Sequence, residues 1–75
     1  MEKCRYILLE NRLPDRVCYG IAAIVEYDGC AVVMQTYADL CADRDAAVRF
    51  VELCNAQELS LCHLPDAAED FAAEQ

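Results

Sequence analysis

Two apolar runs joined by Asp28-Gly29 predict a β-hairpin over residues 17–38. The two-residue turn favoured by Asp-Gly needs positive φ at both central positions. Such a turn sets Tyr27 opposite Cys30, and the pairing then continues residue by residue along both strands. Facing residues of an antiparallel pair point to the same side. The face predicted to join the core is continuously apolar and carries Tyr19, Ile21, Ala23, Val25, Tyr27, Cys30, Val32 and Met34.

The opposite face of this hairpin is mixed. In the same register it carries Cys18, Gly20, Ala22, Ile24, Glu26, Ala31, Val33, Gln35 and Tyr37. A half-apolar outer face is a candidate contact surface, although scattered apolar residues on a surface are also normal. We take Ile24, Val33, Gln35 and Tyr37 as the candidate interface residues.

A first strand is predicted over Cys4 to Leu13, where an apolar run lies between charged residues. Pro14-Asp15 then favours a turn. The short connection predicts antiparallel pairing with the strand that starts at Val17, with Tyr6 and Leu8 on the core face. The three strands form a meander, which needs a covering layer on its apolar face.

The apolar period changes after Tyr37 and predicts two helices. Asp43 is a suitable N-cap for a helix over Arg44 to Cys54, since a carboxylate accepts the first unpaired N–H groups. Asn55 can end this helix, because Asn tolerates the left-handed conformation. Ser60 is expected to cap the turn that follows.

The last helix is predicted to start near Pro65, which costs little in a first turn because its N–H is missing anyway. Leu64 and Phe71 are spaced to dock it on the core. The chain is therefore predicted to be a single α+β domain over residues 1–75, with a three-stranded antiparallel meander and two C-terminal helices packed on one face.

Composition narrows the class of protein. The chain has 75 residues, a hydrophobic fraction of 57% and a net charge of −8. The apolar fraction argues against disorder, and the negative charge argues against nucleic acid as a partner. No apolar run is long enough for a membrane span. Met1 leads directly into a strand-like run without a signal-peptide pattern, so we expect a complete, cytoplasmic chain.

The six cysteines are spread evenly, without a Cys-x-x-Cys pair. In a reducing compartment, cysteines within periodic elements act as small hydrophobic residues. The alternative is a thiol or metal site built from Cys54, Cys62 and His63, the closest cluster of such residues. Cys54 would be the thiol for His63 to activate, whereas the other interpretation makes His63 a capping or packing residue in the Ser60 turn. No cofactor is expected.

Several short motifs resemble a small bacterial family, of Firmicute type, of short stand-alone domains of unknown function. They are Tyr19-Gly20-Ile21, Leu53-Cys54-Asn55, Leu59-Ser60, His63-Leu64 and Glu69-Asp70-Phe71. The chain departs from that pattern at Cys41-Ala42, where a hydroxyl pair is expected. The resemblance implies a small intracellular protein and attaches no activity to it.

These observations favour a non-enzymatic interaction module. The core is thin because much of the apolar content is Ala and Cys, so burial against another chain would add stability. We expect a protein partner or a second copy of the chain as a homodimer, bound through the mixed sheet face or a free edge strand. No nucleic-acid or membrane partner is expected.

Overall fold

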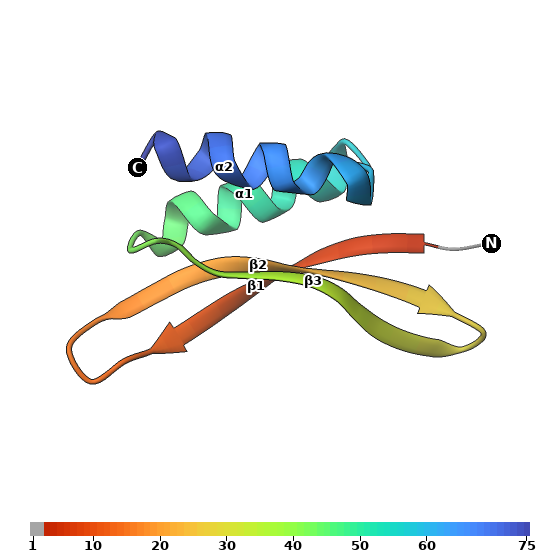
Figure 1. Cartoon of the computed structure of the whole chain (residues 1–75), viewed down its shortest axis with the longest axis horizontal. Helices are drawn as coiled ribbons and strands as arrows, with labels where there is room; N and C mark the ends of the chain where they lie inside the picture. Colours follow the sequence, from red (N-terminus) through yellow and green to blue (C-terminus); the bar gives the residue numbers. More distant parts are fainter. Residues whose placement is uncertain (1–2) are drawn as a thin grey trace.

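A three-stranded sheet and two helices make up the computed structural model, which describes residues 3–75. The strands β1 (Lys3–Arg12), β2 (Val17–Tyr27) and β3 (Cys30–Cys41) are antiparallel and lie in the order β1-β2-β3. Helix α1 (Arg44–Ala56), a 3₁₀ turn (Leu61–His63) and helix α2 (Leu64–Ala73) follow. Both helices lie on one face of the sheet (Figure 1), which confirms the predicted α+β arrangement.

Both predicted turns are present. The Leu13 N–H donates to the Arg16 carbonyl at 2.8 Å and closes the turn around Pro14. Asp28 and Gly29 have φ of 52° and 79°, the left-handed values that a type I′ turn requires. The β1–β2 register sets Tyr6 and Leu8 opposite Ala23 and Ile21. These four side chains therefore share the helix-covered face, as predicted. The short turn between β1 and β2 restricts this register.

The β2–β3 register follows the prediction only as far as Ile24, which lies opposite Val33. The next residue of β2, Ala23, lies opposite Gln35, so Met34 is an extra residue in β3 and forms a β-bulge. A second irregularity lies around Gly20. A side-chain Cβ at Gly20 would overlap the backbone of Tyr37, so only glycine allows β3 to pass this closely.

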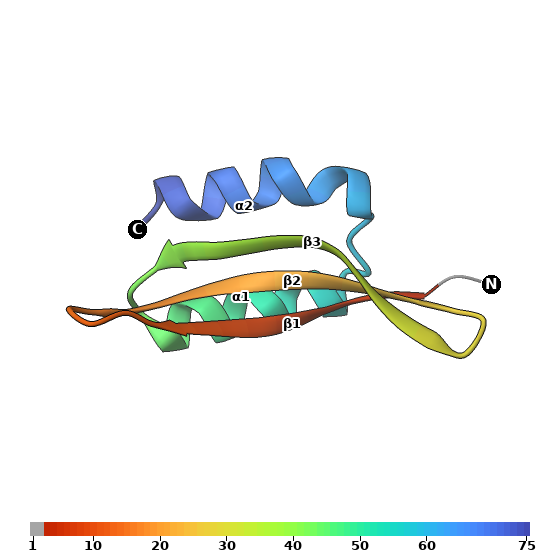
Figure 2. The same ribbon diagram turned by 60° about the horizontal axis from the view of Figure 1, so that its bottom comes forward.

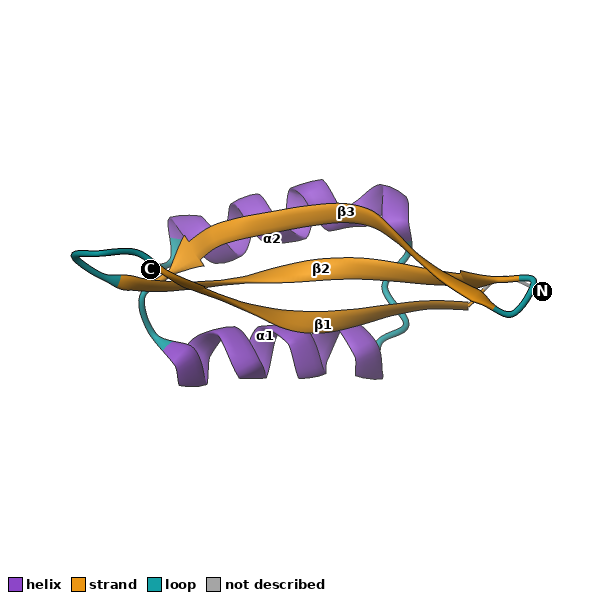
Figure 3. Cartoon of the chain, turned by 90° about the horizontal axis from the view of Figure 1, so that it is seen from below, coloured by secondary structure: helices purple, strands orange, loops and turns teal. Residues whose placement is uncertain are grey.

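The core lies between the sheet and the helices. It consists of Tyr6, Ile21, Ala23, Phe50, Val51, Cys54 and Leu64. The rings of Phe50 and Phe71 stack 4.4 Å apart and join α1 to α2. Helix α1 runs beside β1 and α2 beside β3 (Figures 2 and 3). Leu64 and Phe71 thus dock α2 as predicted.

Helix α1 starts as predicted and ends later. The Asp43 carboxylate accepts the N–H groups of Asp45 and Ala46 at 3.0 and 3.4 Å. The prediction that Asn55 ends the helix is wrong, because the left-handed residue is Glu58, with φ of 49°. The Leu59 N–H then bonds the Cys54 carbonyl, the pattern that closes a helix behind a left-handed residue. Ser60 precedes the 3₁₀ turn, but its side chain makes no capping bond.

Candidate functional site

The face of the sheet without helices carries a band of apolar side chains. We call this band the outer face, and it comprises Ile7, Leu9, Ala22, Ile24 and Val33. Figure 3 views the molecule from this side, with both helices behind the sheet. Ile7 and Val33 are 36% and 58% exposed. Arg5 and Glu26, at the margin, pair at 3.3 Å. This surface can exclude water against another apolar surface without burying an unpaired charge.

Two of the four predicted interface residues do not lie on the outer face. The bulge at Met34 moves the register by one residue, which turns the side chains of Gln35 and Tyr37 to the other face. Tyr37 therefore lies opposite the buried Ile21 and packs against the core, and Gln35 lies opposite Ala23. The predicted face is wrong for Gln35 and Tyr37, whereas Ile24 and Val33 lie on the outer face together.

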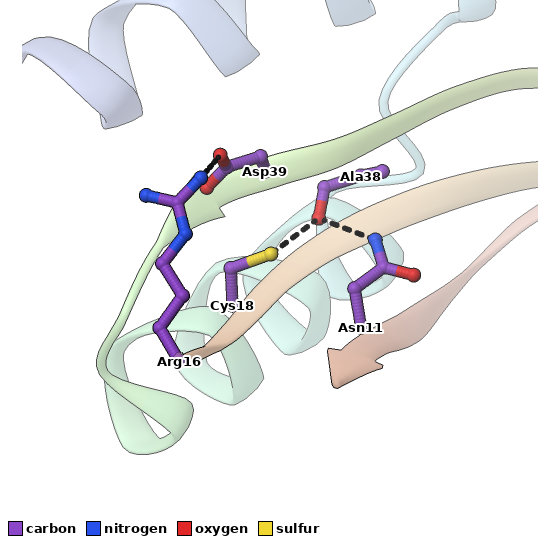
Figure 4. Close-up of polar contacts among 5 residues, drawn as sticks. All are labelled: Asn11, Arg16, Cys18, Ala38 and Asp39. Carbon is purple, nitrogen blue, oxygen red and sulfur yellow. Dashed lines mark hydrogen bonds and ion pairs between the residues drawn. The ribbon is translucent and has the colours of Figure 1, made fainter. Parts of the chain in front are cut away.

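A polar cluster holds the irregular end of β3 (Figure 4). The carbonyl oxygen of Ala38 accepts the Asn11 amide at 3.1 Å and the Cys18 thiol at 3.8 Å. Arg16 pairs with Asp39 at 3.0 Å beside it. Burial and then the Asp39 charge raise the pKa of the Cys18 thiol, which keeps this group a protonated donor. The cluster binds β3 to both other strands, and its chemistry is that of a structural contact.

The end of the β2–β3 hairpin projects past both helices (Figures 1 and 2). Its helix side is therefore uncovered, and a shallow pocket of about 350 Å³ opens there. The pocket is lined by Val25, Tyr27, Val32, Met34 and Leu61. The side chains of Tyr27, Val32 and Met34 are about half exposed or more. We call this the hairpin-end pocket; it has an apolar lining and no charged residue.

The two edges of the sheet differ. At the β1 edge, the Asn55 side chain accepts the Tyr6 N–H at 2.8 Å and donates to the Tyr6 carbonyl at 2.9 Å. This amide occupies the place that a further strand would take. At the other edge, residues 30–38 include no charged residue and no proline, and Val32 and Val33 are 47% and 58% exposed.

The burial and hydrogen bonds of Cys54, Cys62 and His63 give no support to the alternative thiol or metal site. Among residues 3–75 no group of His, Cys, Asp and Glu could hold a metal ion. Cys54 is buried, and burial raises the pKa of its thiol, which disfavours the reactive thiolate. Cys62 and His63 are exposed. The His63 N–H donates to the Ser60 carbonyl at 2.9 Å, so its backbone completes the turn before α2.

A second shallow pocket, also of about 350 Å³, lies between the helices. Its lining combines Phe50, Leu53 and Phe71 with charged residues at the rim, among them Arg49 and Asp70. In the absence of a histidine, thiol or buried carboxylate in this lining, its chemistry is that of a surface groove.

No protein-family model, no curated protein and no solved structure is detectably similar to this chain. In the part of the chain that the structure describes, neither helix has the length and apolar character needed to cross a membrane. The site must be interpreted from its own residues.

Sequence reasoning missed three parts of these surfaces. Ile7 and Leu9 of the outer face come from β1, whose outer side was not assigned. Tyr27, Val32 and Met34 were predicted to join the core, but they are exposed at the hairpin-end pocket because this end of the sheet projects past the helices. A glycine inside a strand, here Gly20, is a known signal of an irregular sheet and could have warned of a changed register. The contact of Asn55 with Tyr6, 49 residues apart, has no local signal.

Proposed function

We propose that this chain is a non-enzymatic interaction module that binds another protein chain through its exposed sheet. One observation carries the proposal: large exposed apolar side chains gather on the sheet and not on the helices. In residues 3–75 there are eight of them, and only Leu53 belongs to a helix. Four of the eight are Tyr27, Val32, Val33 and Met34, at the end of one hairpin.

The arrangement of charge supports the same function. The chain has 14 acidic residues and a net charge of −8, which opposes the approach of another acidic chain. The outer face and the hairpin-end pocket lack unpaired charge among their lining side chains, so contact there costs little electrostatic energy. A cytoplasmic location, which we retain as part of the proposal, would keep the six thiols reduced.

Charge substitutions on the outer face test the proposal. Both Ile7→Glu and Val33→Glu place a carboxylate on the outer face, at partly exposed positions on different strands. Each should weaken binding to the partner roughly tenfold or more, because a charge buried against an apolar surface is costly. Circular dichroism and native mass spectrometry should find the fold intact and the association reduced.

The control is Leu53→Glu, which charges an apolar residue on α1 that is 53% exposed, close to the 58% of Val33. It should leave association unchanged. If all three variants retain every partner that the native chain retains, the sheet is not the binding surface and the proposed function is wrong.

A further inference from the structure

We infer that the occupant of the open edge is a second copy of this chain, paired antiparallel along β3 about a two-fold axis at Val32. The inference deepens the proposed function and rests on it. Two three-stranded sheets would join into one of six strands. A two-fold interface uses the same patch on both copies, so one surface must suit itself.

Backbone geometry selects the register. In a two-residue hairpin, Tyr27 and Cys30 exchange both hydrogen bonds, so the bonded positions of β3 are Cys30 and Val32. The N–H and C=O groups of Ala31 and Val33 therefore point away from β2. In residues 3–75, no backbone bond outside the regular ladder involves either residue. These four groups are a ready template for another strand.

The two-fold axis at Val32 satisfies all four groups at once. Ala31 of each copy then lies opposite Val33 of the other, and each such pair exchanges two hydrogen bonds. Val32 faces its own counterpart between them, at the closer spacing of a non-hydrogen-bonded pair. The bulge at Met34 starts only after this segment, so the strand is regular where the pairing occurs.

The side chains on both faces suit the same pairing. Val32 lines the hairpin-end pocket with Val25, Tyr27, Met34 and Leu61, so the pockets of the two copies would meet around the Val32 pair. The other face of the joint carries Ala31 and Val33, next to Ile24 of the outer face.

Charge favours a second copy at this edge over the β1 edge. Two chains of net charge −8 repel each other, and they repel least where neither brings a charged side chain. Residues 30–38 are uncharged, whereas β1 carries Arg5, Glu10 and Arg12. The β1 edge is also occupied by Asn55 at Tyr6. The molecule thus has one edge that can pair with itself.

Native mass spectrometry and sedimentation of the full chain test the inference over a range of concentrations. The expected result is a species of twice the 8.4 kDa monomer mass. Val32→Glu sets two carboxylates opposite each other at the axis and should raise the dissociation constant roughly tenfold or more. Val33→Pro removes an outward N–H and leaves the intramolecular ladder complete, so it should also favour the monomer.

The matched control is Glu10→Pro. The regular pairing of β1 with β2, and the outward bonds of Tyr6, place the Glu10 N–H on the opposite edge. Glu10→Pro therefore introduces the same proline strain and should leave the dimer intact. Hydrogen exchange gives a readout that needs no variant: the amide protons of Ala31 and Val33 should be protected in the dimer and exchange faster on dilution.

The outcomes separate this inference from the proposed function. If the chain stays monomeric at all concentrations, the inference of a second copy is wrong. The proposed function then depends on whether Ile7→Glu weakens binding to another partner. A dimer that persists in Val32→Glu and Val33→Pro, with fast exchange at Ala31 and Val33, overturns the β3 edge. A dimer lost in Ile7→Glu but kept in Val32→Glu overturns it in favour of the outer face.

Discussion

The two edges of this sheet differ in how their outward backbone N–H and C=O groups are protected. Each edge strand presents backbone groups that lack a partner within the sheet. At β1 the Asn55 amide supplies both partners for Tyr6, and charged side chains flank the site. At β3 the first half of the strand has neither device. The backbone groups of Tyr6 at the β1 edge thus have side-chain partners, whereas those of the first half of β3 have none in the part of the chain that the structure describes. This difference can be tested at each edge.

The largest effect should come from the glycine that sets the path of β3. Gly20→Ala places a methyl group against the backbone of Tyr37, which cannot move without breaking the β2–β3 ladder. We expect a loss of about 3 kcal/mol or more in the free energy of unfolding, enough to leave much of this small domain unfolded. Urea denaturation followed by circular dichroism measures it.

Gly29→Ala is the matched control, in the turn that joins β2 to β3. Gly29 has φ of 79° but open space around it, so the substitution adds conformational strain without overlap. It should cost about 1 kcal/mol. An equal loss in both variants would contradict the close approach at Gly20.

A smaller effect is expected from opening the closed edge. Asn55→Ala removes both side-chain bonds to Tyr6 and should lower the free energy of unfolding by roughly 1 to 3 kcal/mol. The corresponding fall in Tm is roughly 4 to 24 °C for a domain of this size. The Tyr6 amide proton should also exchange faster, which nuclear magnetic resonance can follow.

The control at this edge is Arg5→Gln, which removes the exposed ion pair with Glu26. Exposed pairs contribute less than about 1 kcal/mol, so the Tm should hardly change. The opened edge of Asn55→Ala should not add a new oligomer, because the charges of β1 remain. A new, larger species in this variant would show that Asn55 alone keeps β1 from pairing.

The smallest loss of stability is expected from removing the hydrogen bond of the Tyr6 hydroxyl. This hydroxyl donates to the Leu59 carbonyl at 2.6 Å, and burial is the main cause that raises the pKa of Tyr6 above its ordinary value of 10.0. Tyr6→Phe should cost about 1 kcal/mol at neutral pH. Tyr27→Phe, at a 64% exposed side chain, should cost less and serves as the control.

The same residue predicts how stability depends on pH. The folded chain holds the Tyr6 proton more tightly than the unfolded chain, so above about pH 10 the unfolded state loses a proton that the folded state keeps. This stabilising contribution is complete below pH 10 and is lost as the pH rises above it. The decline should be shallower in Tyr6→Phe; equal slopes would exclude Tyr6 as the group responsible.

Local chemistry made much of this fold predictable. The Asp28-Gly29 turn, the Asp43 cap and the antiparallel pairing of β1 with β2 each depend on residues close in sequence or joined by a short turn. The path of β3 beyond Val33 was not predictable from the alternation of side chains, because the overlap that Gly20 must avoid appears only when two strands meet. One extra residue at Met34 then moved Gln35 and Tyr37 to the opposite face.

The candidate site was predictable to a similar extent. Ile24 and Val33 were placed correctly because they precede the bulge. The contact of Asn55 with the β1 edge was not predicted, because an Asn at this place in a sequence can either end a helix or bond the backbone of a strand. Only the packing of α1 beside β1 selects the second use.

The contact of Asn55 with Tyr6 also has a consequence for the order of events during synthesis. Asn55 is made 49 residues after Tyr6, which at 5 to 20 residues per second is an interval of roughly 2 to 10 seconds. Cys41, the last residue of β3, is made 14 residues before Asn55, so all three strands exist with both edges uncovered for roughly the last 1 to 3 seconds of that interval. Arg5, Glu10 and Arg12 are present from the start, so the ribosome-bound strand is protected by charge before its amide partner exists.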